Sequence, residues 1–158
     1  MLKSIKHQFM AFRNGIVADA LRKAGDPHSV IFGLQLPQIT EISRTLPHDA
    51  DLARALWQDR NVRESRLLAT RIFPADQLTV DEAYDMIRSV CTREEADIIT
   101  FYLLKHTQHL PTLLNMIETS EVQDSGQQGD QNEASAANCK LSDTVRMWIT
   151  DAIKRNIG

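Results

Sequence analysis

Apolar residues recur along the chain at steps of three and four positions, the spacing that places them on one face of an α-helix. The N-terminal members of this pattern are Ile5, Phe9, Phe12, Ile16, Ala20 and Leu21. Gly25, followed by an aspartate and a proline, ends the pattern. We therefore predict one long N-terminal helix over residues 2–24.

The stretch VIFGL at residues 30–34 is the one place where a strand can be argued. It is short and has no partner run, so we interpret it as a buried connector. Six further helical segments are predicted between residues 37 and 119. Their predicted starts are Pro37 as a first helical residue, Asp49 or Asp51 and Asn61 as N-caps, and the capping boxes Thr79 with Glu82 and Thr92 with Glu95.

The predicted fold class is all-α. Short turns make neighbouring helices antiparallel, and pairs that recur every 25 to 35 residues or so favour a HEAT-like or armadillo-type stack over a plain bundle. This helical domain is predicted over residues 1–120. A last helix, over residues 141–158, carries an apolar stripe and is expected to dock back on the same domain through Trp148.

Between these parts, residues 121–140 change composition sharply, with many Gln, Ser, Gly and Asn and no aromatic residue. Such a segment cannot bury enough apolar area to offset its chain entropy, so we predict a flexible acidic linker. Residues 118–133 hold five acidic and no basic residues. Without them, 16 acidic and 18 basic residues remain, so the net charge of -3 hides a slightly basic body. A basic body permits phosphate contacts without requiring them.

Several classes of function are not indicated. The chain has no run that could span a membrane and no secretory signal pattern, which favours a cytoplasmic location. No Gly-rich phosphate loop and no metal-spaced motif is present, so we expect neither a metal nor a cofactor. The five histidines form no ligand set in sequence, and Cys91 is interpreted as a small core residue.

Four charged residues are candidates for a site. Arg60, Arg63 and Arg66 lie three residues apart, which brings them close together on a helix. They form either a solvated polar face with Glu64 nearby or a basic strip on the concave side of the stack that contacts phosphates. Asp97 follows one turn inside a predicted helix and either faces a pocket or borders the core stripe.

Three runs, in this order and spacing, resemble the DNA alkylation repair family of HEAT-like alkylpurine DNA glycosylases (AlkD-type proteins). They are FGLQLPQ at residues 32–38, Leu56-Trp57 at a helix end, and RESRLLA at residues 63–69. The resemblance covers about residues 30–105. It implies an all-α solenoid whose positively charged concave surface cradles duplex DNA, without a metal or a cofactor.

In that family the catalytic carboxylate follows a Trp-Trp-Asp-x-x-Asp run, and the resemblance places Asp97 at its position. Glu94 matches the first aspartate, whereas Thr92 and Arg93 stand where the tryptophans would be. The carboxylate is thought to stabilise positive charge on the sugar as an alkylated base departs. Two hypotheses follow. One is a DNA glycosylase with Asp97 as catalyst and the three arginines on phosphates; the other is a non-catalytic HEAT-like scaffold that binds DNA or a protein partner.

Overall fold

The computed structural model describes residues 1–120 and 141–157, and its regular structure within these ranges is entirely helical. The α-helices are α1 (Leu2–Ala11), α2 (Gly15–Lys23), α3 (Leu36–Arg44), α4 (Ala50–Gln58), α5 (Arg63–Ile72), α6 (Val80–Arg88), α7 (Arg93–Tyr102), α8 (Leu110–Thr119) and α9 (Asp143–Ile157). Two 3₁₀ turns, η1 (Ala75–Gln77) and η2 (Leu104–His106), join some of them. The all-α prediction is therefore confirmed for the described residues, where Val30 makes only an isolated bridge to Val62.

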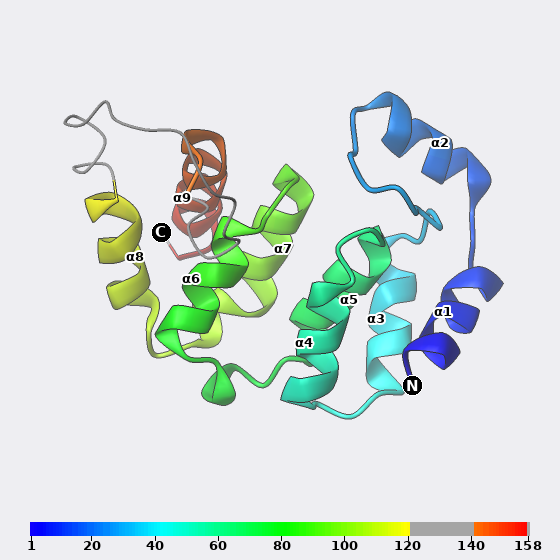
Figure 1. Cartoon of the computed structure of the whole chain (residues 1–158), viewed down its shortest axis with the longest axis horizontal. Coiled ribbons are helices and arrows are strands. Elements are labelled where there is room, and N and C mark those ends of the chain that lie inside the picture. The colour runs from blue at the N-terminus through cyan, green and yellow to red at the C-terminus, as the bar shows by residue number, and fades with distance from the viewer. Residues whose placement is uncertain (121–140, 158) are drawn as a thin grey trace, which may run out of the picture.

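The helices follow one another in chain order, from α1 and α2 at one end to α8 and α9 at the other (Figure 1). Helix α4 packs along α5, α6 packs beside α8, and α7 packs along α9. Because α5 also contacts α3 and α7, the helices α3, α5, α7 and α9 form one row. Helix α6 contacts α8 and is joined to α4 by the Arg54–Glu82 ion pair, so α4, α6 and α8 form a second row. This arrangement is consistent with the predicted stack of antiparallel helix pairs.

Most helix starts lie where cap chemistry predicted them. Asp49 accepts a hydrogen bond from Leu52 N at the start of α4, and the Thr79 and Thr92 hydroxyls accept from the amides three residues on. The Asn61 prediction is wrong, because α5 begins after Val62 without a side-chain cap. Here the backbone is held from outside the helix: Val30 N donates to Asn61 O, and Arg63 N donates to Val30 O.

The prediction of one N-terminal helix is also wrong, because the chain breaks between α1 and α2. Asn14 has extended backbone angles, and its side chain accepts hydrogen bonds from Ile16 N and Val17 N. Asn14 N in turn donates to Phe32 O, 2.8 Å away. The apolar spacing runs through this break, so periodicity alone could not show it; the capping side chain and a distant carbonyl decide it.

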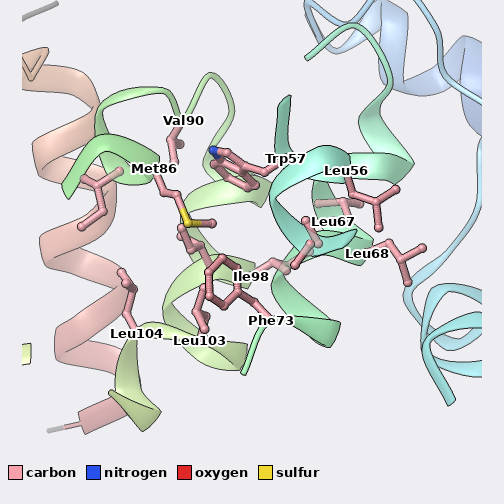
Figure 2. Packing of buried hydrophobic residues seen from close by; sticks show 14 of the residues in the cluster. Leu56, Trp57, Leu67, Leu68, Phe73, Met86, Val90, Ile98, Leu103 and Leu104 are labelled. Atoms are coloured by element: carbon pink, nitrogen blue, oxygen red, sulfur yellow. The ribbon is translucent and has the colours of Figure 1, made fainter. Parts of the chain in front are cut away.

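One continuous core joins the two rows. Trp57 of α4, Met86 of α6 and Ile98 of α7 converge on it, and Phe73 closes it at the end of α5 (Figure 2). Helix α9 joins the same core through three buried residues, which are Val145, Ile149 and Ile153. Trp148 is partly buried and packs against the same core, so the last helix docks through Trp148 as predicted and through this aliphatic stripe as well. The predicted linker, residues 121–140, lies outside the described residues.

A single buried carboxylate organises the loop that leads from α2 to α3. Glu64 is fully buried, and its carboxylate accepts hydrogen bonds from the backbone amides of Phe32, Gly33 and Leu34 at 3.0–3.3 Å. Gly33 has φ +83°, and a Cβ there would lie 2.1 Å from the Asn14 carbonyl oxygen. The loop therefore passes directly against the start of α2, and only glycine fits.

Among the described helices, none combines the length and the apolar character that crossing a membrane requires.

The matched variants Gly33→Ala and Gly25→Ala distinguish two causes of lost stability, the steric clash of an added Cβ and the strain of a positive φ. Both glycines have positive φ, but a Cβ at Gly25 meets nothing within 4 Å. We expect Gly25→Ala to lower the free energy of unfolding by about 1–2 kcal/mol, from strain alone. Gly33→Ala should cost about 1–3 kcal/mol more, because backbone atoms must shift. Urea unfolding followed by circular dichroism measures both; equal losses would contradict the close packing at Gly33.

Candidate functional site

Asp97 lies at the seam between α7 and α9. Its neighbours Ala96 and Ile98 are buried in the core, while its own side chain is 37% exposed. The carboxylate Oδ1 is 2.6 Å from Nη2 of Arg155, whose side chain is 52% exposed. Asp97 is thus a carboxylate that solvent reaches and that a guanidinium from the last helix holds in place.

The three arginines do not share one exposed face. Arg60 is exposed, whereas Arg63 and Arg66 are only 4% and 2% exposed. Arg63 donates to Glu94 through Nε and Nη2, at 2.9 and 2.6 Å, and through Nη1 to Leu34 O. The prediction of a solvent-facing basic strip is therefore wrong for Arg63 and Arg66, because both side chains are buried and pair with groups inside the fold. Of the three, Arg60 alone faces solvent.

Arg66 connects an aromatic ring to a buried acid. Its guanidinium carbon lies 3.9 Å from the centre of the Trp57 ring, and its Nη2 donates to the Ser89 carbonyl oxygen at 2.8 Å. The Arg66 Nε is 3.1 Å from Glu95 Oε1. Burial lowers the pKa of the Arg66 guanidinium, and the nearby Glu95 carboxylate opposes this effect. Arginine stays charged in proteins, so Arg66 supplies a fixed positive charge behind Trp57.

Glu95 is also the centre of a cluster that sequence reasoning missed. Its Oε1 accepts from His28 Nε2 at 2.8 Å, and its Oε2 accepts from Cys91 N at 2.9 Å. His28 Nδ1 lies 2.5 Å from Asp26 Oδ1, and the Cys91 Sγ lies 3.6 Å from His28 Nε2. Cys91 itself is exposed, so its interpretation as a core residue is wrong. The cluster joins the loop before α3 to the start of α7.

Hydrogen bonds keep His28 protonated. Burial is the largest single influence and disfavours the charged ring, but hydrogen bonds with Cys91, Glu95 and Asp26 outweigh it and raise the His28 pKa to about 10. Burial likewise acts against an ionised Glu95, yet His28 and Arg66 lower the Glu95 pKa below its ordinary value. At neutral pH the cluster therefore pairs two cations with two buried carboxylates.

A cleft of about 670 Å³ opens beside Trp57, between α4 and α6. The Trp57 Nε1 donates to Ser89 Oγ, and Arg54 spans the cleft wall to Glu82 with its Nε 2.5 Å from Oε1. Its lining residues are Arg54, Trp57, Gln58, Arg60, Phe73, Thr79, Glu82, Asp85, Met86, Arg88 and Ser89. Aromatic and guanidinium groups line it together, a combination that suits a planar or anionic ligand.

Comparison with known proteins shows to which family this helical stack belongs. A family model described as DNA alkylation repair enzyme matches residues 5–119 of the 158-residue chain. The chain therefore belongs to the DNA alkylation repair enzyme family. No curated protein and no solved structure matches it. The matched range contains Asp97 and the three arginines but ends before α9, which supplies Arg155.

The local sequence does not reveal the roles of the missed residues. Glu95 is the third helical residue of a capping box, a position where a carboxylate usually turns back to its own backbone. Its oxygens instead reach Cys91 N and His28, and the histidine partner is 67 residues away in sequence. Arg155 stands in the last turn of α9, where a basic residue is ordinary, so nothing local marks it as the partner of Asp97.

The raised His28 pKa predicts a pH dependence of stability. The folded state binds this proton more tightly than the unfolded chain, whose histidine titrates near 6.5. The stabilisation is therefore fully present below pH 6.5 and is lost as the pH rises through about 10. We expect the free energy of unfolding to fall across this window by at most about 1.4 kcal/mol per pH unit.

His28→Asn should be less stable at pH 6.5 and should show a flatter pH profile up to pH 10. His48→Asn, at an exposed loop position, serves as the control and should keep the wild-type profile. Urea unfolding at several pH values measures the difference. Parallel profiles for wild type and His28→Asn would show that the His28 proton does not stabilise the fold.

Proposed function

We propose that the chain binds alkylated duplex DNA and that Asp97 promotes departure of the alkylated base. The observation that supports this is the position of Asp97: its carboxylate is 37% exposed and is held 2.6 Å from Arg155 at the α7–α9 seam. Membership of the DNA alkylation repair enzyme family supports the same class of substrate. Arg60 and Lys154, which lies in the basic last turn of α9, are the proposed phosphate contacts.

The proposed chemistry needs only charge and position. An N-alkylated purine carries positive charge, and its bond to the sugar breaks with both electrons leaving on the base. Positive charge then grows on the sugar, where a fixed carboxylate lowers its energy most strongly if water is excluded. Arg155 holds Oδ1 and so fixes the orientation of the carboxylate before substrate arrives. Water completes the reaction at the sugar carbon, and no metal or cofactor takes part.

Asp97→Asn tests the catalytic step. The substitution keeps the shape but removes the charge, so release of methylated purine from alkylated duplex DNA should fall on the order of 10²-fold. Asp19→Asn is the matched control, because it also breaks an exposed pair, between Asp19 and Arg22 of α2, far along the stack. Released base is quantified by chromatography. Release that is equal in wild type and Asp97→Asn would refute the role of Asp97.

A second candidate function is a non-catalytic module that binds DNA. The observation that favours it is the pair Thr92 and Arg93, which stand where the resembled glycosylases carry tryptophans; Arg93 is exposed at the start of α7. Such a module would hold the duplex through its phosphates and release no base. Wild-type protein that binds duplex DNA but leaves methylated purines at the uncatalysed rate would establish this function in place of the first.

Phosphate contact by Arg60 has its own test. Arg60→Gln should weaken binding equally for unrelated DNA sequences and should reduce the slope of log affinity against log salt by about 1. Arg22→Gln, on α2, is the control and should leave the slope unchanged. Fluorescence anisotropy at several salt concentrations gives both values. Absence of DNA binding by the wild type at low salt would overturn both functions and favour a protein partner.

A further inference from the structure

Three different metal-ligating atoms converge beside the start of α7. They are His28 Nε2, Cys91 Sγ and a carboxylate oxygen of Glu95, and all lie within 4.8 Å of one another. The Sγ is 3.6 Å from Nε2 and 3.5 Å from Glu95 Oε2, while Nε2 is 2.8 Å from Oε1. These residues come from a loop and a helix start that are more than 60 positions apart in the chain.

Two of these three separations match the edges of a metal coordination shell. The third, 2.8 Å from Nε2 to Oε1, is a hydrogen bond that opens when an ion binds. Tetrahedral sites with bonds of about 2.0–2.3 Å to nitrogen, oxygen and sulfur place their ligand atoms about 3.3–3.7 Å apart. The two distances that involve sulfur already have this length. We propose that His28, Cys91 and Glu95 form a binding site for a divalent transition-metal ion of the Zn²⁺ type. Thiolate, imidazole and carboxylate together are a donor set that suits such an ion.

The surroundings of His28 support this assignment. Its other ring nitrogen, Nδ1, lies 2.5 Å from Asp26 Oδ1. Histidines that bind metals commonly donate from the second ring nitrogen to a carboxylate, which orients the ring and directs the free nitrogen at the ion. Asp26 therefore stands where a supporting carboxylate belongs. The ion takes the place of the proton that Nε2 now shares with Glu95.

A divalent ion offsets the charges of its own acidic ligands. It carries two positive charges, which cancel the Cys91 thiolate and the Glu95 carboxylate, and Asp26 keeps the Arg63 guanidinium 4.0 Å away as a cationic neighbour. This matters because His28 and Glu95 side chains are each only 1% exposed, where an unbalanced charge is costly. Arg66 Nε lies 3.1 Å from Oε1. The other oxygen, Oε2, is the one that faces the Cys91 sulfur.

The exposure of Cys91 opens the site on one side. The ion reaches the buried histidine and glutamate from the solvent face of Cys91. With three protein ligands, a fourth position remains for water, as it does in sites where zinc is reactive rather than structural. The proposed metal ligands do not include Asp97 or Arg155. The metal-binding proposal is therefore independent of the proposed base excision.

Titration of the full, chelator-treated protein with Co²⁺ tests the proposal. A Co²⁺–thiolate bond gives an absorption band in the near ultraviolet, and a tetrahedral ion gives bands in the visible range. We expect both to saturate at one equivalent of Co²⁺ and to disappear when Zn²⁺ is added. Cys91→Ser should abolish the ultraviolet band. Cys139→Ser removes the chain's other cysteine and should leave the band intact.

Two further variants separate the ligands from their support. His28→Asn should remove saturable binding, whereas Asp26→Asn should weaken it by about 10- to 100-fold. Circular dichroism checks that each variant is folded, and Cys91→Ser keeps the test valid even if a buried variant unfolds, because Cys91 is exposed. No saturable band in the wild type, or an unchanged band in Cys91→Ser, would overturn the proposal and leave the cluster as a purely structural network.

Discussion

Helix α5 is buried along nearly its whole length, although it carries Arg63, Glu64 and Arg66 within one turn. Charges removed from water destabilise a fold unless partners with good geometry surround them. Here Arg63 pairs with Glu94 and Glu64, while Arg66 lies 3.1 Å from Glu95 and donates a hydrogen bond to the Ser89 carbonyl oxygen. Because the acidic partners come from α7 and from α5 itself, the positions of the two helices depend on the pairing.

The same pairing places the segment before α3. Glu64 accepts hydrogen bonds from three backbone amides of the loop. Glu95 accepts a hydrogen bond from His28, which lies near the start of the same loop. The loop is thereby held against α5 and α7, and Gly33 lets it approach the start of α2. Residues that a sequence comparison would mark as a DNA-contacting helix thus serve the interior of the fold. The polar groups that solvent reaches lie elsewhere, at Asp97, at Arg60 and in the cleft beside Trp57.

The proposed function rests on family membership and on the position of one carboxylate. The chain belongs to the DNA alkylation repair enzyme family, and its carboxylate at the α7–α9 seam is open to solvent. In the proposed base excision, the carboxylate acts most strongly where water is excluded. Thr92 and Arg93 stand where the resembled glycosylases carry tryptophans. The partner of Asp97 comes from α9, outside the matched residues, so the last helix completes the proposed site.

Local rules suffice for much of this molecule. The helical class, most helix bounds and the caps at Asp49, Thr79 and Thr92 follow from apolar spacing and from hydrogen bonds within one turn. The break at Asn14 does not, because the apolar spacing continues across it while a carbonyl 18 residues away holds the turn.

The placement of charges is decided by the tertiary structure alone. Whether Arg63 and Arg66 face solvent or the core depends on acids 29 to 31 residues away, and Asp97 meets Arg155 across 58 residues. Periodicity indicates which face of a helix is apolar. It does not indicate which polar residue will find a buried partner, since that energy exists only once distant segments have packed together.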